Sequence, residues 1–159
     1  MVWFGPLCGC VSGGCAWNHA PYLADVLGLE IRSDGKRKIA LHPSDVDIDE
    51  NIGEAEQQSY PIDLLWFYNQ VKTNGPWDYK QRNTQFENFG SFNYGATGTA
   101  MGIPERLLRR QTGIAQLRNN TSKPEWGKPG GGPPYGDDPN DQTKIGMGID
   151  YFTCGCHER

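Results

Sequence analysis

The sequence lacks two features that define large classes of proteins. It contains no run of about 18 apolar residues, so it offers no segment that would span a membrane. It also has no excess of positive charge, because 19 Asp and Glu residues outnumber 15 Lys and Arg residues and give a formal net charge of −4. A nucleic-acid-binding protein usually carries a basic face, and the clearest local basic cluster here is formed by Arg106, Arg109 and Arg110.

Residues 1–15 lack the basic start and the long apolar core of a secretory signal peptide. We therefore expect that the protein, if it leaves its cell, does so by another route or as one piece of a longer polypeptide. The glycine- and cysteine-rich start fits such a piece.

Apolar residues are also scarce, at 36% of the chain, whereas 21 Gly and 11 Pro supply many turns. This composition is less apolar than that of an average domain. The chain nevertheless includes 5 Trp, 7 Tyr and 6 Phe, which can form a core and exclude a disordered chain. The length of 159 residues suits one globular domain.

The five cysteines lie near the two ends of the chain, and three interpretations of them remain open. One is a structural zinc site, since thiolates form tetrahedral zinc sites; its ligands would be Cys8, Cys10, Cys154 and Cys156. The second is disulfides that join the two ends. Because the chain has five cysteines, Cys15 among them, one thiol would be left unpaired. The third is free thiols. In each case the role is structural, and we expect no cofactor for catalysis.

Three segments have the apolar spacing and the end signals of helices: residues 61–72, 102–118 and 137–152. A proline suits the first turn of each helix, and an aspartate can cap the third helix. These residues are Pro61, Pro104, Pro139 and either Asp137 or Asp138. The first segment carries a wide apolar set, which predicts a largely buried helix. That set is Ile62, Leu65, Trp66 and Val71.

The predicted fold is therefore mainly α within the α+β class. A small β-hairpin is indicated by Ser33–Lys36, an Asp-Gly turn between two β-prone runs. Alternating aspartates follow at positions 45, 47 and 49, where a solvated edge or a helix cap is favoured over a calcium site, because the glycine and glutamate of an EF-hand are missing. We assign residues 1–60 to an irregular N-terminal region, which could be a delivery linker, and residues 61–159 to the catalytic domain.

Residues 119–136 form a long loop rich in proline and glycine. Loops of more than about 15 residues are uncommon in compact domains unless they are functional or disordered, so this one could be a lid or a cleft wall. Three further clusters mix aromatic rings, carboxylates and glycine at the ends of predicted helices, where functional side chains often lie. They are residues 75–81, 87–98 and 135–142.

Four blocks along residues 66–152 resemble the bacterial polymorphic toxin type 44 family. They occur in the same order as in the family and read WFYNQVKTNGPWDYKQ, FENFGSFNYGATGTAMG, LLRRQTGIAQ and YGDDPNDQ. The resemblance implies an antibacterial toxin module that is carried by a large secreted or injected protein and neutralised by a cognate immunity protein. It also implies a nuclease, from which this chain departs: it is acidic, and no histidine lies in the four blocks.

A second resemblance bears on mechanism. Glu87 followed by NYGATGTAMG is similar to the core of lysozyme-like lytic transglycosylases, in which a catalytic glutamate ends a helix before a glycine-rich loop. This resemblance implies a lysozyme-like helical fold and makes Glu87 the general acid. It also makes Asn93, Tyr94 and Gly95–Gly98, Thr97 among them, the lining of a glycan groove.

The chemistry of these residues is coherent with cleavage of a glycosidic bond. Cleavage of this bond needs a protonated carboxyl group near the leaving oxygen. It also needs a second carboxylate that stabilises the cation or directs a water molecule. Candidates for the second carboxylate are Asp78, Asp137 and Asp138. Flat aromatic faces and polar groups would contact the sugars. Beyond the groove residues just named, these are Trp77, Tyr79, Lys80, Gln116 and Tyr135.

Three functions therefore remain in competition. The first is a toxin that cleaves peptidoglycan glycan strands in the periplasm of a target bacterium, delivered by a secretion apparatus or a larger carrier protein. The second is a ribonuclease toxin that acts on RNA in the target cytoplasm. Its groups would be Asp78, Lys80, Tyr94, Arg106, Arg109 and Arg110. The third is a wall-binding or adaptor module without catalysis.

Overall fold

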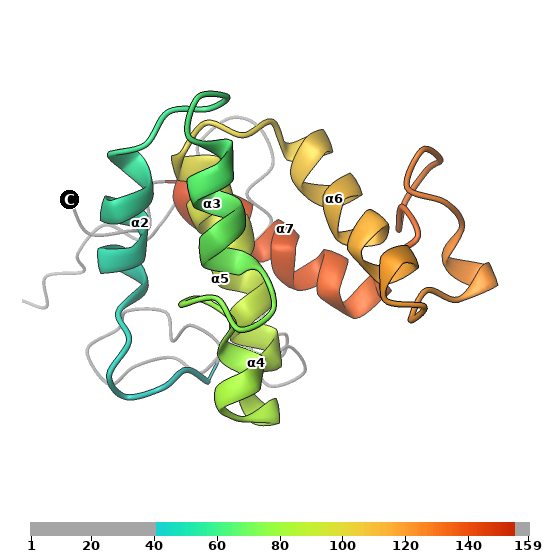
Figure 1. The fold of residues 1–159 in the computed structure, drawn as a ribbon, viewed down its shortest axis with the longest axis horizontal. Helices are drawn as coiled ribbons and strands as arrows, with labels where there is room; N and C mark the ends of the chain where they lie inside the picture. Colours follow the sequence, from blue (N-terminus) through green and yellow to red (C-terminus); the bar gives the residue numbers. More distant parts are fainter. Residues whose placement is uncertain (1–40, 155–159) are drawn as a thin grey trace, which may run out of the picture.

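The structure is a computed structural model that describes residues 41–154, and the statements below concern that range (Figure 1). The predicted mainly helical fold is confirmed. The elements are α2 (Ile48–Glu56), α3 (Leu64–Val71), α4 (Tyr79–Arg82), η2 (Thr84–Phe86), α5 (Glu87–Ala100), α6 (Glu105–Arg118), η3 (Pro124–Trp126) and α7 (Pro139–Thr153). None of these helices combines the length and the apolar character that crossing a membrane requires.

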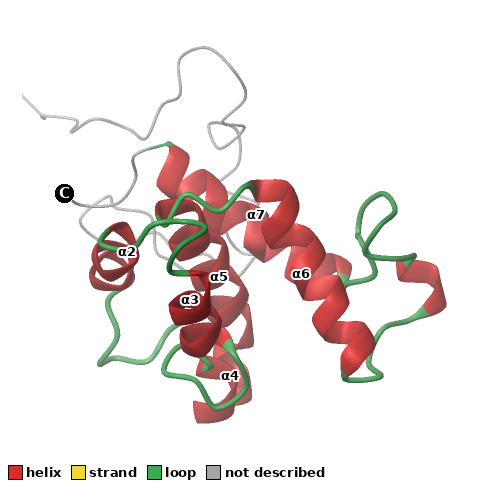
Figure 2. Cartoon of the chain, turned by 45° about the horizontal axis from the view of Figure 1, so that its top comes forward, coloured by secondary structure: helices red, strands yellow, loops and turns green. Residues whose placement is uncertain are grey.

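The β part of the predicted fold receives no support. No strand occurs between residues 41 and 154. The turn of the expected hairpin, Ser33–Lys36, lies outside the described residues, and the last residues of its second run, 41–43, are not in a strand. The described part of the chain is therefore built from helices and loops alone (Figure 2).

Helix α5 runs through the middle of the fold, with α2 on one side and α6 on the other (Figures 1 and 2). It makes its most extensive contacts with α7 and also packs on α2. Its buried side chains, such as Phe89 and Phe92, join Ile52 of α2 and Ile145 of α7 in one hydrophobic core. The core thus connects elements that are far apart in the sequence.

Two glycines let α5 and α7 approach each other closely. A Cβ atom at Gly95 would lie 2.2 Å from the carbonyl oxygen of Ile145, and one at Gly148 would lie 2.0 Å from the carbonyl oxygen of Phe92. No real side chain tolerates such contacts, so each helix uses a glycine where the other backbone passes. Within the glycine-rich segment 87–98, Gly95 therefore serves the crossing of two helices and does not make a turn.

Helix α3 differs from its prediction. It begins at Leu64, three residues after Pro61, and the residue that it buries is Phe67. Ile62 and Leu65 are 84% and 71% exposed, so the expectation of a largely buried helix is wrong for them. The remainder of the predicted apolar set, Trp66 and Val71, is partly buried against the core.

Helix α2 begins at the alternating aspartates. The side chain of Asp47 accepts a hydrogen bond from the backbone N–H of Asp49 at 2.8 Å, which confirms the helix-cap interpretation. The helix then buries Ile48, Ile52 and Ala55 in the common core. Part of the region before residue 60 is therefore helical and packed with the rest, whereas the sequence predicted an irregular segment.

Candidate active site at the start of helix α7

The start of α7 is fixed by the capping signals that the sequence predicts. Asp138 is the N-cap residue and accepts a hydrogen bond from the N–H of Asn140 at 2.8 Å. Pro139 follows at the first helical position, where its missing N–H costs nothing. The first turn of α7 lies between α5 on one side and α6 on the other, and each side holds a different set of polar groups.

Around Asp141, on the side facing α5, is an acidic cluster, which we define as Asp141 with the three carboxylates whose charges raise its pKa: Asp137, Glu87 and Asp138. Asp141 is partly buried and accepts a hydrogen bond from the Ser91 hydroxyl at 3.1 Å. A second cross-link joins the same two helices, because the Asn140 amide donates to the Asn88 side-chain oxygen at 3.1 Å. Glu87 is exposed at the first position of α5, one turn before Ser91.

Asp141 is the member of this cluster with an altered proton affinity. Burial is the main cause and, with the negative charge of Asp137, raises the pKa of Asp141 from 3.8 to about 6. The hydrogen bond from Ser91 opposes this rise in pKa, and the charges of Glu87 and Asp138 add to it. Asp141 can therefore hold a proton near neutral pH beside carboxylates, which is what a general acid requires.

Asp137 is the most buried member of the cluster and is 1% exposed. Its side-chain oxygen accepts a hydrogen bond from the Gln142 amide at 2.8 Å. Burial chiefly, and the charge of Asp137 in addition, raise the pKa of Tyr94. The Tyr94 hydroxyl is used within the fold, because it donates to the carbonyl oxygen of Leu108 at 3.0 Å.

The side facing α6 is an open groove of about 600 Å³. Its lining consists of Glu105, Arg109, Pro133, Pro134, Tyr135, Pro139 and Gln142. Arg109 donates to the Glu105 carboxylate at 2.7 Å and to the carbonyl oxygen of Gln142 at 3.0 Å, so its guanidinium is held between α6 and α7. Gln142 connects the groove to buried Asp137 and thus to the acidic cluster.

The wall of the groove at Tyr135 is built by close backbone contact. A Cβ atom at Gly113 of α6 would lie 1.9 Å from the carbonyl oxygen of Tyr135, so glycine is required there. The N–H of Gly136 donates to the carbonyl oxygen of Trp126 at 2.8 Å and closes the base of the loop that leads to Tyr135. The long loop 119–136 therefore does form one wall of a groove, as its length suggested.

Five of the residues predicted for the site lie around the start of α7. They are Glu87, Tyr94, Tyr135, Asp137 and Asp138. Asp141 was missed, although it stands in the quoted block YGDDPNDQ. Its spacing of three residues after the cap Asp138 was the available signal, but burial against α5 could not be seen in the sequence.

Four predicted substrate-binding residues are core residues instead. Trp77 and Tyr79 are 6% and 2% exposed, and Asn93 and Thr97 are 1% and 0% exposed. Trp77 packs edge-on against Trp66 with ring centroids 5.5 Å apart. The Tyr79 hydroxyl accepts a hydrogen bond from the Asn51 amide at 2.7 Å. The side-chain oxygens of Asn93 and Thr97 also form hydrogen bonds inside the fold. In this conformation these side chains do not reach a substrate.

The remaining candidates lie elsewhere on the surface. Asp78 accepts a hydrogen bond from the N–H of Asn74 at 2.8 Å and stabilises the turn before α4, which is a structural use. Lys80 is exposed on α4. Gln116 accepts a hydrogen bond from the Thr121 hydroxyl at the end of α6. No contact in the described residues joins these three to the acidic cluster.

The local geometry assumed from the lytic transglycosylase core is also wrong. Glu87 begins a helix, whereas in that core the glutamate ends one. The segment Gly95–Gly98 continues α5 and is buried, so it is neither a loop nor a groove lining. An exposed glutamate at a helix start has no apolar pocket, which removes the physical basis for Glu87 as the general acid.

The cysteine and metal questions receive a partial answer. Cys154 is disulfide-bonded, in agreement with the disulfide interpretation and not with a zinc-bound thiolate at this position. The other four cysteines lie outside the described residues. Within residues 41–154, no group of three or more His, Cys, Asp or Glu side chains could hold a metal ion.

Comparison with known protein families shows what the second half of this chain is similar to. Residues 81–154 match the family model described as Bacterial toxin 44, which confirms the resemblance found in the sequence. The matched segment contains α5, α6 and α7, and with them the acidic cluster and the groove. The match supports a bacterial toxin effector. Neither the curated proteins nor the solved structures yielded a match.

Proposed function

We propose that this toxin domain hydrolyses glycosidic bonds of cell-wall glycan strands, with Asp141 as the proton donor and Glu87 as the second carboxylate. The observation that carries the proposal is the pairing of two unlike carboxyl groups across α5 and α7. Asp141 is partly buried with a raised pKa, and Glu87 is exposed nearby and contributes to that rise. Carboxyl groups in unlike environments are the recurring arrangement in glycosidases.

The two residues would divide the chemistry as follows. Protonated Asp141 gives its proton to the leaving glycosidic oxygen while the bond to the sugar carbon breaks. The hydrogen bond from Ser91 keeps its carboxyl group in one orientation. Ionised Glu87 stabilises the positive charge that develops on the sugar or directs the attacking water molecule. This division reassigns the acid role that the sequence had given to Glu87.

The surroundings favour a sugar polymer over RNA at this position. The groove offers three prolines as apolar surfaces, with Arg109 and Gln142 as polar groups beside them. The neighbouring acidic cluster would repel the phosphates of RNA. Arg109, a candidate of the ribonuclease alternative, is already engaged by Glu105 and Gln142.

The decisive experiment is digestion of purified peptidoglycan by the wild-type protein and by Asp141→Asn. We expect the substitution to lower the rate by about 10²–10⁴-fold, the usual contribution of a general acid. Asparagine keeps the oxygen that accepts from Ser91, so the fold is preserved. Glu87→Gln should also slow the reaction, whereas the exposed control Glu125→Gln on η3 should not.

The pH profile gives a second readout of the same proposal. The rate should fall as the pH rises through about 6, because Asp141 then loses the proton that it must donate. If Asp141→Asn digested peptidoglycan as fast as the wild-type protein, the assignment of Asp141 as the acid would be refuted. Absence of any digestion by the wild-type protein, combined with cleavage of RNA, would refute the proposed substrate.

A further inference from the structure

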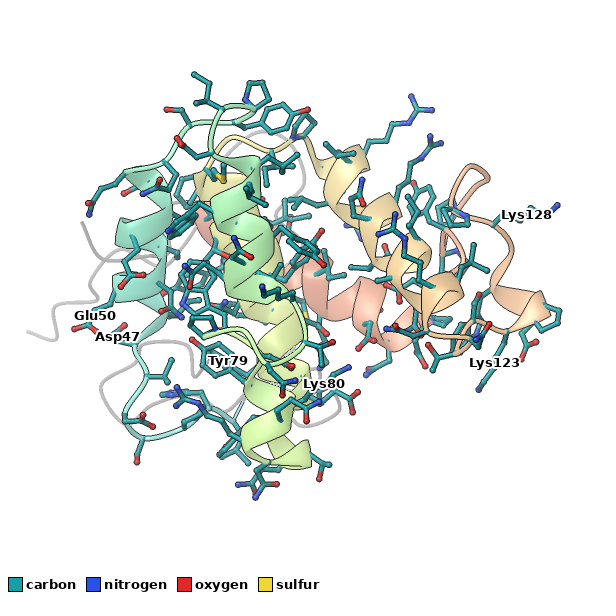
Figure 3. All side chains as sticks on the ribbon, viewed as in Figure 1. Asp47, Glu50, Tyr79, Lys80, Lys123 and Lys128 are labelled. Carbon is teal, nitrogen blue, oxygen red and sulfur yellow. The ribbon has the colours of Figure 1, made fainter. Side chains whose placement is uncertain are left out.

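Charge is distributed unevenly along the described chain. Residues 105–136, which we call the cationic lobe, consist of α6, η3 and the loops around η3 and contain six Lys and Arg residues against two Glu residues. The rest of residues 41–154 contains thirteen Asp and Glu residues against four Lys and Arg residues. Lys123 and Lys128 lie at one end of the molecule, and Asp47 and Glu50 of α2 lie at the other (Figure 3).

Most cations of the lobe are not neutralised. Arg109 forms an ion pair with Glu105 at 2.7 Å. No ion pair within residues 41–154 involves any of the other five, which are Arg106, Arg110, Arg118, Lys123 and Lys128. Four of them are exposed, and Arg110 is partly buried. Unpaired cations that lie on one lobe produce a positive potential, which attracts polyanions.

The lobe also contains three glycines in a row, Gly130–Gly132. Added Cβ atoms at Gly130 and Gly132 would meet nothing within 4 Å, and neither residue has the positive φ that favours glycine. Neither packing nor backbone conformation therefore requires glycine at these two positions. Glycine without a structural need on an exposed loop lets a ligand approach the backbone N–H groups closely.

Arg110 connects this loop to α6. Its guanidinium lies 5.8 Å from the centre of the Tyr135 ring and makes long contacts of 3.4 and 3.5 Å with the carbonyl oxygens of Gly130 and Gly131. Its buried Nε atom has no hydrogen-bond partner. These contacts hold the exposed glycine loop beside the cations of α6, so that positive charge and a loop without side chains occur on one surface.

We propose that the cationic lobe binds a base-free phosphodiester polymer of the bacterial cell wall, of the polyol phosphate type. Phosphate groups match unpaired Lys and Arg side chains and a glycine loop. RNA carries the same phosphates, but proteins that bind single strands add exposed aromatic rings on which bases stack. In the lobe, Trp126 is 9% exposed and the ring of Tyr135 lies under Arg110, so such a platform is missing from the described residues.

The test measures binding of deacylated lipoteichoic acid, a glycerol phosphate polymer, at several salt concentrations. The matched variants are Lys123→Ala with Lys128→Ala in the lobe, and Lys72→Ala with Lys80→Ala outside it. Both pairs remove two exposed charges. We expect the lobe variant to weaken binding about tenfold at 50 mM salt and to reduce the salt slope by about 1.4, at about 0.7 per phosphate contact. The control variant should change the affinity less than about twofold, because its cations lie outside the positive surface.

Two further arms complete the test. Gly130→Ala with Gly132→Ala should keep the thermal midpoint and weaken binding severalfold, which separates the backbone contribution from folding. The wild-type protein should bind poly(uridylic acid) more weakly than the glycerol phosphate polymer. Equal loss in the two lysine variants, unchanged binding by the glycine variant, or tighter binding of the RNA would each overturn the proposal. None of these measurements depends on which bond the toxin cleaves.

Discussion

At the scale of single residues, the function of a carboxyl group here depends on what surrounds it. Glu87 and Asp141 both occur in glycine-containing segments that the sequence marks as functional. Glu87 is exposed, whereas Asp141 is partly buried next to Asp137. The raised proton affinity of Asp141 is therefore a product of the contact between α5 and α7.

This raised pKa has a consequence for stability. The folded pKa of Asp141 is about 6, above its ordinary value of 3.8, so the folded protein binds the proton more tightly than the unfolded chain. The contribution of this proton to stability is present below about pH 4 and is lost as the pH rises through about 6. Asp141→Asn removes the titrating group and should stabilise the protein at pH 7 to 8 by on the order of 1 kcal/mol.

Denaturant unfolding of both proteins across pH 3 to 8 would measure this difference. The gain in the midpoint should vanish near pH 3, where wild-type Asp141 is protonated in both states. Glu125→Gln, which changes an exposed carboxyl group, serves as the control and should show little difference at any pH. A gain in Asp141→Asn that did not depend on pH would contradict the raised pKa.

At the scale of secondary structure elements, the crossing of α5 and α7 organises the site. This crossing brings Ser91 to Asp141 and Asn88 to Asn140, pairs that are 50 and 52 residues apart in the sequence. Gly95 and Gly148 permit it, because each lies against a backbone carbonyl of the opposite helix. Their lack of a side chain therefore permits the approach of α5 and α7 that brings Ser91 to Asp141.

Substitution of alanine tests this crossing directly. In an open helix position, Gly→Ala stabilises by about 1 kcal/mol because alanine has the higher helix propensity. Gly90 on α5 is such a position, with nothing within 4 Å of an added Cβ atom. At Gly148 the Cβ atom would lie 2.0 Å from the Phe92 carbonyl oxygen, so we expect a loss of about 3 kcal/mol from overpacking.

The measurement is the free energy of unfolding of Gly90→Ala, Gly148→Ala and the wild-type protein. The changes of the two variants relative to the wild type should have opposite signs. A Gly148→Ala protein as stable as the wild type would show that α5 and α7 do not cross at this distance. A Gly90→Ala protein that lost stability would show instead that α5 is less regular at its first turns.

At the scale of the whole molecule, positive and negative charges are separated within residues 41–154. The cationic lobe lies at one end and α2 with its acidic side chains at the other (Figure 3). The acidic cluster and the groove lie on the two sides of the first turn of α7. In the proposed toxin, the lobe would hold an anionic polymer of the wall while the neighbouring site acts on the glycan.

Toxicity by compartment tests this arrangement in cells. Expressed in a bacterium with an exported leader, the domain should cause rounding and lysis; without the leader it should be harmless, because glycan strands lie outside the cytoplasm. Asp141→Asn with the leader should be at least tenfold less toxic, since it lacks the proton donor. The readout is the surviving fraction of cells after induction. If the domain killed cells only when the leader was absent, an intracellular substrate such as RNA would be favoured.

The sequence by itself determined the local features of this protein. The cap at Asp138, the proline after it and the apolar spacing of α7 involve residues one to four positions apart, and these predictions were confirmed. The same holds for the cap at Asp47 and for the family resemblance of segment 81–154. Such signals are readable because neighbours in sequence are neighbours in space whatever the fold.

Tertiary structure decided the rest. Glycines in segment 87–98 predict turns locally, yet Gly95 lets α5 pack as the central helix because the distant backbone of α7 fills the space beside it. Trp77 was expected at a substrate and is buried, while Ile62 was expected in the core and is exposed. Burial, close approach and the pKa of Asp141 arise from contacts between segments that are dozens of residues apart, and a local pattern does not contain them.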